Sequence, residues 1–196
     1  MRIIDALSRK GAPASIPECQ RADLPQFFVD MGYTIGAEIG VYKAGFTEKF
    51  CKVGLKMFAI DGWCAYDEYN EPSRNIQARQ DFLYGHAQRV LAPYPSCTII
   101  RKPSMEALVD FQNESLDFVY IDANHTFKYV VEDIYEWSKK VRKGGVIAGH
   151  DYAETNIIKV KIAVKAYTRA YGIKNWYVLG AEVRGEQFSS WFWIKD

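Results

Sequence analysis

Short runs of consecutive apolar residues alternate along the chain with longer stretches in which apolar side chains recur every three or four positions. The short runs predict buried β-strands at residues 34–39, 56–60, 97–101, 116–121 and 146–148. The longer stretches predict helices at residues 22–31, 46–53, 74–92, 128–141 and 156–171, with one more beginning at Pro103. Two further runs, at residues 176–179 and 190–194, predict a closing antiparallel pair.

This alternation predicts an α/β fold with a doubly wound, mostly parallel sheet and a ligand at the carboxyl ends of its strands. The chain has 196 residues, of which 48% are hydrophobic, and no linker divides it. We therefore predict a single domain over residues 1–196, with an N-terminal helical segment at 1–33 and the sheet core at 34–196. The polar segment 62–75 is predicted to be a lid or acceptor-facing loop, with a plain surface loop as the alternative.

Composition and charge exclude several classes of protein. The formal net charge is +1, and lysine and arginine form no run long enough for a nucleic-acid patch or a membrane anchor. No stretch of about eighteen apolar residues and no signal-peptide pattern occurs, so we expect a cytoplasmic protein without membrane or nucleic-acid partners. The four cysteines have no C-x-x-C spacing, which is evidence against a zinc site or a disulfide framework.

The most informative segment is the glycine turn after the strand at 34–39. A phosphate-binding P-loop would place lysine after the second glycine, but Phe46 follows Gly45. A dinucleotide fingerprint would place glycine at position 42, where the Tyr42 side chain would crowd a pyrophosphate. What remains is an acidic residue late in the strand, Glu38, followed by Gly40 and Gly45. That pattern favours a ligand with an ammonium group and no phosphate, such as S-adenosylmethionine.

Later strands also end in polar residues. Asp61 follows the strand at 56–60 about twenty residues after the turn, where a carboxylate can accept hydrogen bonds from both ribose hydroxyls. The strand at 116–121 runs into Asp122-Ala-Asn-His125. An acidic side chain after so apolar a run favours a role in a site, because burying it unpaired would be costly.

The strand at 146–148 runs into Gly149-His150-Asp151-Tyr152. With these motifs the chain resembles the class I S-adenosylmethionine-dependent methyltransferases, above all the small ones with Asp-x-x-His after the fourth strand and Gly-His-Asp-Tyr after the fifth. The resemblance covers roughly residues 30–180. It implies a seven-stranded sheet whose last strand is antiparallel.

The resemblance also implies a set of cofactor contacts. Glu38 and the glycine turn would hold the amino-acid end, Asp61 the ribose, and Asp122 the methionine part. Adenine would lie near Trp63, Ser104 and Met105, although Trp63 could simply be packed and the other two could form an ordinary first helical turn. The implied cofactor-binding residues are Glu38, Gly40, Val41, Tyr42, Gly45, Asp61, Gly62, Trp63, Ser104, Met105 and Asp122.

A divalent metal is a further possibility that the resemblance raises. In catechol-type relatives an Asp-Asn pair after the fifth strand binds magnesium together with the aspartate of the fourth. The corresponding ligands here would be Asp122, His150 and Asp151. Because magnesium prefers oxygen, the histidine favours manganese, iron or zinc. Alternatively, His150 and Asp151 line the acceptor pocket or form a hydrogen bond with each other.

His125 is the predicted general base, with Asp122 and His150 as the other candidate catalytic residues. His125 stands where the catechol-type relatives have a lysine that takes the proton of the acceptor, and imidazole can do this near neutral pH. The alternative is that His125 caps the following helix. His86 lies on a predicted surface helix and has no expected role.

We therefore expect an enzyme that methylates a hydroxyl of a small metabolite or sugar, with nitrogen as the less favoured nucleophile. Two other classes stay open. One is an inactive scaffold that keeps the nucleotide fold, against which the presence of Glu38, Asp61, Asp122 and His125 argues. The other is an NAD-linked oxidoreductase, which cofactor binding would distinguish.

Overall fold

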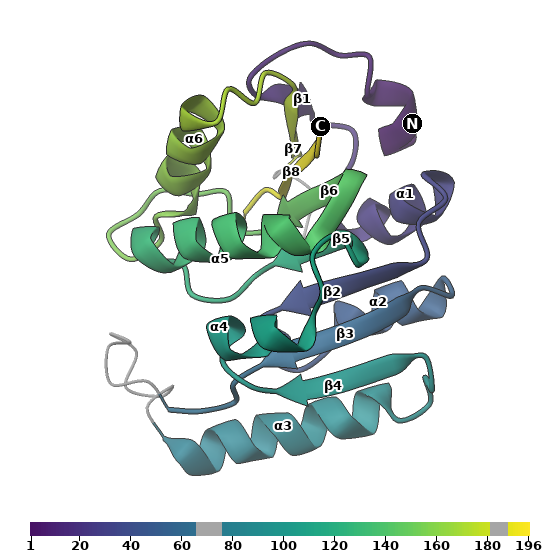
Figure 1. Cartoon of the computed structure of the whole chain (residues 1–196), viewed down its shortest axis with the longest axis vertical. Helices are drawn as coiled ribbons and strands as arrows, with labels where there is room; N and C mark the ends of the chain where they lie inside the picture. The colour runs from purple at the N-terminus through teal and green to yellow at the C-terminus, as the bar shows by residue number, and fades with distance from the viewer. Residues whose placement is uncertain (66–75, 181–187) are drawn as a thin grey trace.

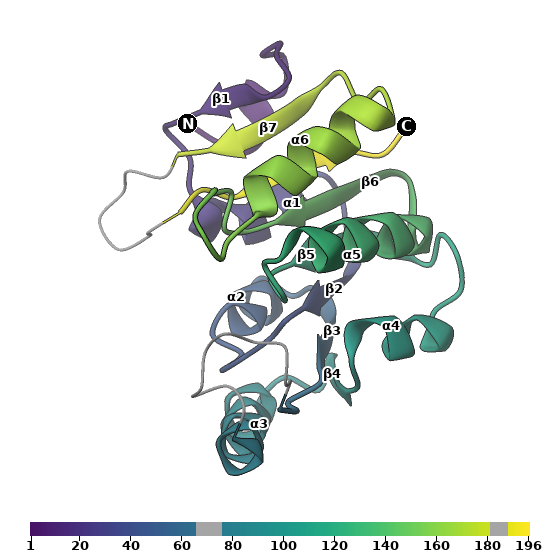
Figure 2. The same cartoon turned by 90° about the vertical axis from the view of Figure 1, so that its left-hand side faces the viewer.

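The computed structural model describes residues 1–65, 76–180 and 188–196. One sheet of eight strands, in the order β1-β7-β8-β6-β5-β2-β3-β4, runs through the molecule with helices on both faces (Figure 1, Figure 2). The strands are β1 (Ala14–Ile16), β2 (Ile35–Ile39), β3 (Lys56–Asp61), β4 (Cys97–Arg101), β5 (Leu116–Ile121), β6 (Val141–Gly149), β7 (Trp176–Leu179) and β8 (Trp191–Ile194). The α-helices are α1 (Leu24–Asp30), α2 (Thr47–Lys52), α3 (Gln77–Leu91), α4 (Ser104–Ala107), α5 (Phe127–Lys140) and α6 (Val160–Ala170). Short 3-10 helices cover Ile3–Ala6, Arg21–Asp23 and Leu108–Asp110.

The predicted fold class is confirmed. Strands β2 to β6 pair in parallel, and β8 lies antiparallel between β6 and β7. The strand count differs from the expected seven, because β1 pairs in parallel with β7 and adds an eighth strand at the edge. The segment at 1–33, which we expected to be helical, therefore also contributes to the sheet. β1 has only three residues between Pro13 and Pro17, too few to show a strand period.

Two element boundaries also differ from the predictions. Strand β6 begins at Val141 rather than after the glycine pair, and the register of its pairing with β5 shifts between Leu116 and Phe118. Helix α6 begins at Val160, later than expected, because the hydroxyl of Thr155 accepts hydrogen bonds from the backbone N–H groups of residues 157 and 158 and closes a turn there. Most of the predicted lid at 62–75 lies outside the described residues.

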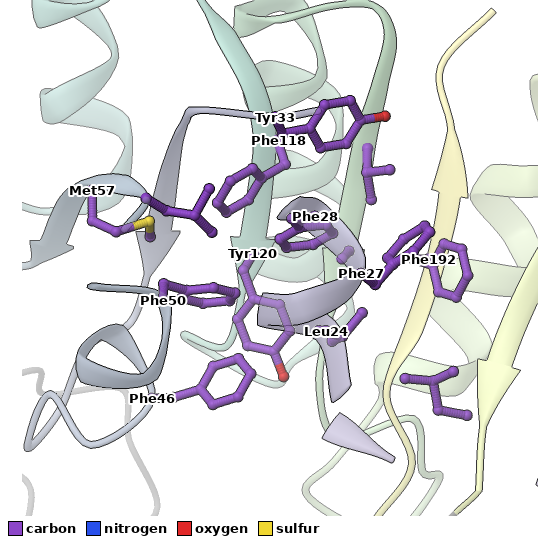
Figure 3. Close-up of a cluster of buried hydrophobic side chains, with 14 of the residues drawn as sticks. Leu24, Phe27, Phe28, Tyr33, Phe46, Phe50, Met57, Phe118, Tyr120 and Phe192 are labelled. Atoms are coloured by element: carbon purple, nitrogen blue, oxygen red, sulfur yellow. The ribbon is translucent and has the colours of Figure 1, made fainter. Parts of the chain in front are cut away.

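Each face of the sheet has its own hydrophobic cluster. Helices α1, α2 and α3 pack on one face and α4, α5 and α6 on the other (Figure 2). The first cluster is rich in aromatic rings, with Phe28 stacked on Phe118 at 4.1 Å between centroids and Phe46 beside Tyr120 at 4.7 Å (Figure 3). These clusters hold the strands rigidly behind the edge where the polar residues lie. No helix in the described part of the chain combines the length and the apolar character needed to cross a bilayer.

The pairing register aligns the carboxyl ends of three neighbouring strands. Ile39 at the end of β2 lies opposite Ile121 of β5, and Ile121 lies opposite Gly149 of β6. The residues that follow these strands therefore emerge side by side at one edge of the sheet, as expected for parallel strands. This edge carries the candidate site.

Candidate active site

Gly40 allows the backbones after β2 and β5 to approach each other closely. Its φ is +91°, and a Cβ on it would lie 2.1 Å from the carbonyl oxygen of Asp122. The amide of Asp122 donates to the carbonyl of Ile39 at 2.8 Å, and the amide of His150 donates to that of Ile121 at 3.1 Å. These bonds extend the sheet by one residue and fix where the Asp122 and His150 side chains begin.

Glu38 lies in the interior with only 1% of its surface exposed. Its carboxyl accepts a hydrogen bond from the hydroxyl of Thr47, in the first turn of α2. Burial raises the pKa of Glu38 to about 8, against the opposing influence of Thr47 and of the nearby Arg21 cation. The carboxyl is therefore largely protonated at neutral pH, and an ammonium group beside it would favour the ionised form.

Two hydrogen bonds tie the glycine turn to the end of β3, and a third orients the Asp61 carboxylate. The amide of Tyr42 donates to Oδ2 of Asp61 at 2.9 Å, and the amide of Trp63 donates to Oδ1 at 2.8 Å. Nε1 of Trp63 donates to the carbonyl of Tyr42 at 2.9 Å. The two amides hold the Asp61 carboxylate in one orientation at the end of β3.

The rest of the turn leaves room for a ligand at one point. Val41 is buried, Tyr42 is 45% exposed with φ +53°, and Gly62 is half-buried. A Cβ added to Gly45 would have no described atom within 4 Å, apart from those of Gly45 itself and its two neighbours in the chain. A ligand could therefore approach the backbone here.

Two of the residues predicted to contact adenine have partners within the protein. The Trp63 ring is buried and lies 5.0 Å from the Tyr84 ring of α3, which matches the packing alternative. The hydroxyl of Ser104 donates to the carboxyl of Asp133 and accepts from Nε1 of Trp137 at 2.8 Å, so it ties α4 to α5. Met105 packs against the second hydrophobic cluster.

A second polar group lies at the ends of β5 and β6. Nε2 of His125 is 3.0 Å from Oδ2 of Asp151 and 3.5 Å from Oδ1 of Asp122. One donor atom from each of these three residues lies within 4.8 Å of the others, a spacing that could hold a metal ion. His150 was the predicted third ligand, but the structure brings His125 into this group. Nδ1 of His150 instead lies 3.0 Å from Oδ1 of Asp151.

The charged side chains of this group shift one another's pKa values. Burial lowers the pKa of His125, but the carboxylates of Asp122 and Asp151 outweigh burial and raise it to about 9. Burial raises the pKa of Asp151, and the two histidines outweigh it and hold the pKa well below the usual range. Asp151 also has φ +50°, a strained backbone that is typical of functional sites. At neutral pH His125 is therefore a cation held between two carboxylates.

A small cavity of about 10 Å³ lies behind this group, against β5, α5 and the start of α6. His125, His150, Val130, Val160 and Trp191 are among the residues that line it. Nε2 of His150 is buried and has no hydrogen-bond partner in the described part of the chain. The cavity has room for about one water molecule, which would give this nitrogen a partner.

Arg21 joins the site from the N-terminal segment, and sequence analysis did not single it out. Its Nη2 donates to Oδ2 of Asp122 at 2.7 Å, across 101 positions of sequence. Its guanidinium carbon lies 4.0 Å from the centroid of the Phe46 ring. Arg21 belongs to no motif, so its role could be found only from the fold.

Comparisons with known proteins agree with this geometry. A family model described as a methyltransferase domain matches residues 34–152, which is more than half of the chain. Among solved structures, an O-methyltransferase from Bacillus cereus in complex with SAH has a TM-score of 0.64 at 15% identity, covering 89% of this chain and 80% of that one. The O-methyltransferase TomG from Streptomyces achromogenes, in complex with SAM, has a TM-score of 0.63 at 11% identity, covering 90% and 79%.

An rRNA methylase from Streptococcus thermophilus is similar to the same degree, with a TM-score of 0.63 at 14% identity, covering 90% of this chain and 97% of that one. At such identities the structural likenesses show the fold, while the family model shows the family. No curated protein is similar enough in sequence to count as a match. The chain belongs to the methyltransferase domain family and is an enzyme of the methyltransferase class.

Proposed function

We propose that this protein transfers the methyl group of S-adenosylmethionine to a hydroxyl oxygen of a small molecule. The observation that carries the proposal is the convergence of Glu38, Asp61, Asp122 and His125 at one edge of the sheet. Structural neighbours in complex with SAH and SAM support the choice of cofactor. When bound, the cofactor supplies an electrophilic methyl carbon. The protein has to orient the acceptor, exclude water and remove the proton of the acceptor hydroxyl.

The residues present fit this cofactor. Glu38 offers a buried carboxyl for the ammonium group, and Asp61 is already oriented by two backbone amides for the ribose hydroxyls. Gly45 leaves the backbone accessible beside them. Phe46 and Tyr42 disfavour phosphates, so a nicotinamide dinucleotide or a nucleoside triphosphate fits less well.

His125 is the proposed proton acceptor. Carboxylate oxygens of Asp151 and Asp122 lie 3.0 and 3.5 Å from its Nε2, and the acceptor hydroxyl would have to reach this nitrogen. Asp151 also contacts His150, so it orients both imidazoles. A general base needs the atom that accepts the proton within hydrogen-bond reach of the substrate. Because the pKa of His125 is about 9, its imidazole has to lose its own proton before it can act as the base.

The first experiment tests the cofactor. With S-adenosylhomocysteine at a hundred times its dissociation constant, we expect the fold to be stabilised by about 2.7 kcal/mol, measured by thermal unfolding. Asp61→Ala should weaken binding, because it removes the ribose contact. Asp110→Ala should not, because Asp110 lines a hollow with Ile35 and Leu116, the first residues of β2 and β5. A stabilisation by NAD and none by S-adenosylhomocysteine would contradict the proposal and favour the oxidoreductase alternative. Binding without turnover of any acceptor would favour the inactive scaffold.

The acceptor class has its own test. The protein is incubated with methyl-labelled S-adenosylmethionine and, in parallel samples, a metabolite extract or total RNA. We expect label in a small molecule of the extract and none in the RNA. A net charge of +1 without a basic run supports this expectation, because nucleic-acid binding draws on clustered positive charge. Label found in RNA alone would instead assign the function of the rRNA methylase neighbour.

A second candidate role for the same group is to hold a divalent cation. Asp122, His125 and Asp151 would be its ligands, in place of the set with His150, and two oxygens with one imidazole suit manganese, iron or zinc. Such an ion supplies a Lewis acid that lowers the pKa of an acceptor hydroxyl.

Metal analysis separates the two roles. If the cation is required, the purified protein should contain a stoichiometric ion, Asp151→Asn should lose it, and exhaustive chelation should abolish turnover until the ion is restored. If His125 acts as the base without a metal, chelation should leave turnover unchanged. Thermal unfolding of the chelated protein provides a readout that does not depend on activity.

A further inference from the structure

We propose that Arg21 binds the carboxylate at the methionine end of the cofactor, so that the N-terminal segment supplies a cation beside Phe46, at the end of the glycine turn. The inference rests on the proposed function, because it assigns a second charged contact to the same cofactor. Arg21 lies outside residues 34–152, which the family model matches, and outside every motif found in the sequence.

The position of the guanidinium carries the argument. It lies between the ends of β2 and β5, where its Nη2 donates to Asp122 at 2.7 Å. One aromatic platform supports it, formed by Phe46 at 4.0 Å and Tyr120 at 5.3 Å from the guanidinium carbon. These two rings adjoin each other in the first hydrophobic cluster (Figure 3). Cation–π contacts of this kind orient a guanidinium as well as attract it.

Phe46 occupies the sequence position at which a phosphate-binding turn would have a lysine. The turn therefore has no cation of its own at this point, yet the fold places one directly against the Phe46 ring. A guanidinium is always charged and has five N–H donors in a planar fork, so it can bond two carboxylates at once. While its Nη2 donates to Asp122, the guanidinium carries a full positive charge that attracts a ligand carboxylate at this edge of the sheet.

The neighbouring charges match a zwitterion. An α-amino acid presents an ammonium and a carboxylate on the same α-carbon, and the site presents a carboxyl at Glu38 and a guanidinium at Arg21. The two side chains are near enough to interact electrostatically. Glu38 would receive the ammonium and Arg21 the carboxylate, which favours one orientation of the methionine end.

The experiment compares two ligands that differ only at this carboxylate: S-adenosylhomocysteine and its decarboxylated analogue, which keeps the ammonium. Dissociation constants are measured by calorimetry for the wild type, for Arg21→Gln and for Arg9→Gln. Arg9 provides a matched control, since it also lies in the N-terminal segment but pairs with Glu18.

For Arg21→Gln we expect S-adenosylhomocysteine to bind roughly ten- to a hundredfold more weakly, because the variant loses one hydrogen-bonded contact between charged groups. The decarboxylated analogue should bind the wild type and Arg21→Gln equally, and Arg9→Gln should behave as the wild type with both ligands.

Three outcomes would overturn the proposal. An equal loss of affinity for both ligands in Arg21→Gln would mean that Arg21 only positions Asp122 or supports the fold. Thermal unfolding of the variant without ligand would show an effect on the fold directly. Unchanged binding of S-adenosylhomocysteine would remove Arg21 from the cofactor site. Unchanged cofactor binding with a raised KM for the acceptor would reassign Arg21 to an acceptor carboxylate. If the wild type binds neither ligand, the proposed function fails first, so the two failures are distinguishable.

Discussion

Replacing His125 with alanine should lower kcat by roughly a hundred- to ten-thousandfold while leaving the affinity for S-adenosylhomocysteine nearly unchanged. The expectation follows from the position of Nε2, which two carboxylates orient at the edge where an acceptor would bind. His86→Ala is the matched control, because His86 lies on α3 away from this edge. Near-normal turnover of the true acceptor by His125→Ala would make His125 a structural residue, and His150 would become the candidate base.

The pH dependence of the chelated protein tests the same assignment. With a pKa of about 9, His125 is protonated at neutral pH and can take a proton only after losing its own. If the chelated protein is active, kcat/KM should therefore fall about tenfold for each pH unit below 9. Asp151→Asn should move the midpoint downwards, because the Asp151 carboxylate helps to hold the proton on the imidazole. A profile that stays flat between pH 7 and 10 would contradict a base role for His125.

Replacing Gly40 with alanine should destabilise the protein by about 3 kcal/mol or more. The added Cβ would lie 2.1 Å from a backbone oxygen of Asp122, and the residue would have to keep φ +91°. Overpacking against backbone costs roughly 1–3 kcal/mol, and a non-glycine residue at such a φ costs a similar amount. The free energy of unfolding from denaturant titration measures the change.

Gly45→Ala is the control for this prediction. It adds the same methyl group to the same turn, where space is open, and should change the unfolding free energy by much less. Because that open space is the proposed approach for the cofactor, Gly45→Ala should weaken cofactor binding instead. Equal stability of the two variants would show that the ends of β2 and β5 can separate at little cost.

The parallel sheet and its antiparallel closing strand could be predicted because their signals are local. Strand runs such as 116–121 are continuous and apolar, and each is followed by a helical pattern that brings the chain back across the sheet. Strand β1 was missed for the converse reason. Its three residues lack a visible period, and what makes them a strand is their pairing with β7, which lies far along the chain.

Which carboxylates gather at the site could also be inferred from the sequence, because parallel strands end at one edge. Glu38 lies one residue before the end of β2, and Asp61, Asp122 and Asp151 end or closely follow strands, so all four lie along the carboxyl edge of the sheet. The direction of a side chain is a different matter. Ser104 turns inward to Asp133 and Trp137, because a buried carboxyl and an indole N–H need partners there, and no spacing rule conveys that.

The sequence by itself determined the fold class, the edge of the sheet that carries the candidate site and the residue types available there. All three depend on local periodicity and on the rule that parallel strands end at one edge. Only the tertiary structure decided that His125 rather than His150 lies between Asp122 and Asp151, and that Arg21 reaches the glycine turn. Those arrangements depend on χ angles, on the strained backbone at Asp151 and on contacts across about a hundred positions of sequence. Such contacts are settled by packing and by the pairing of buried charge, which act between residues that the linear order keeps apart.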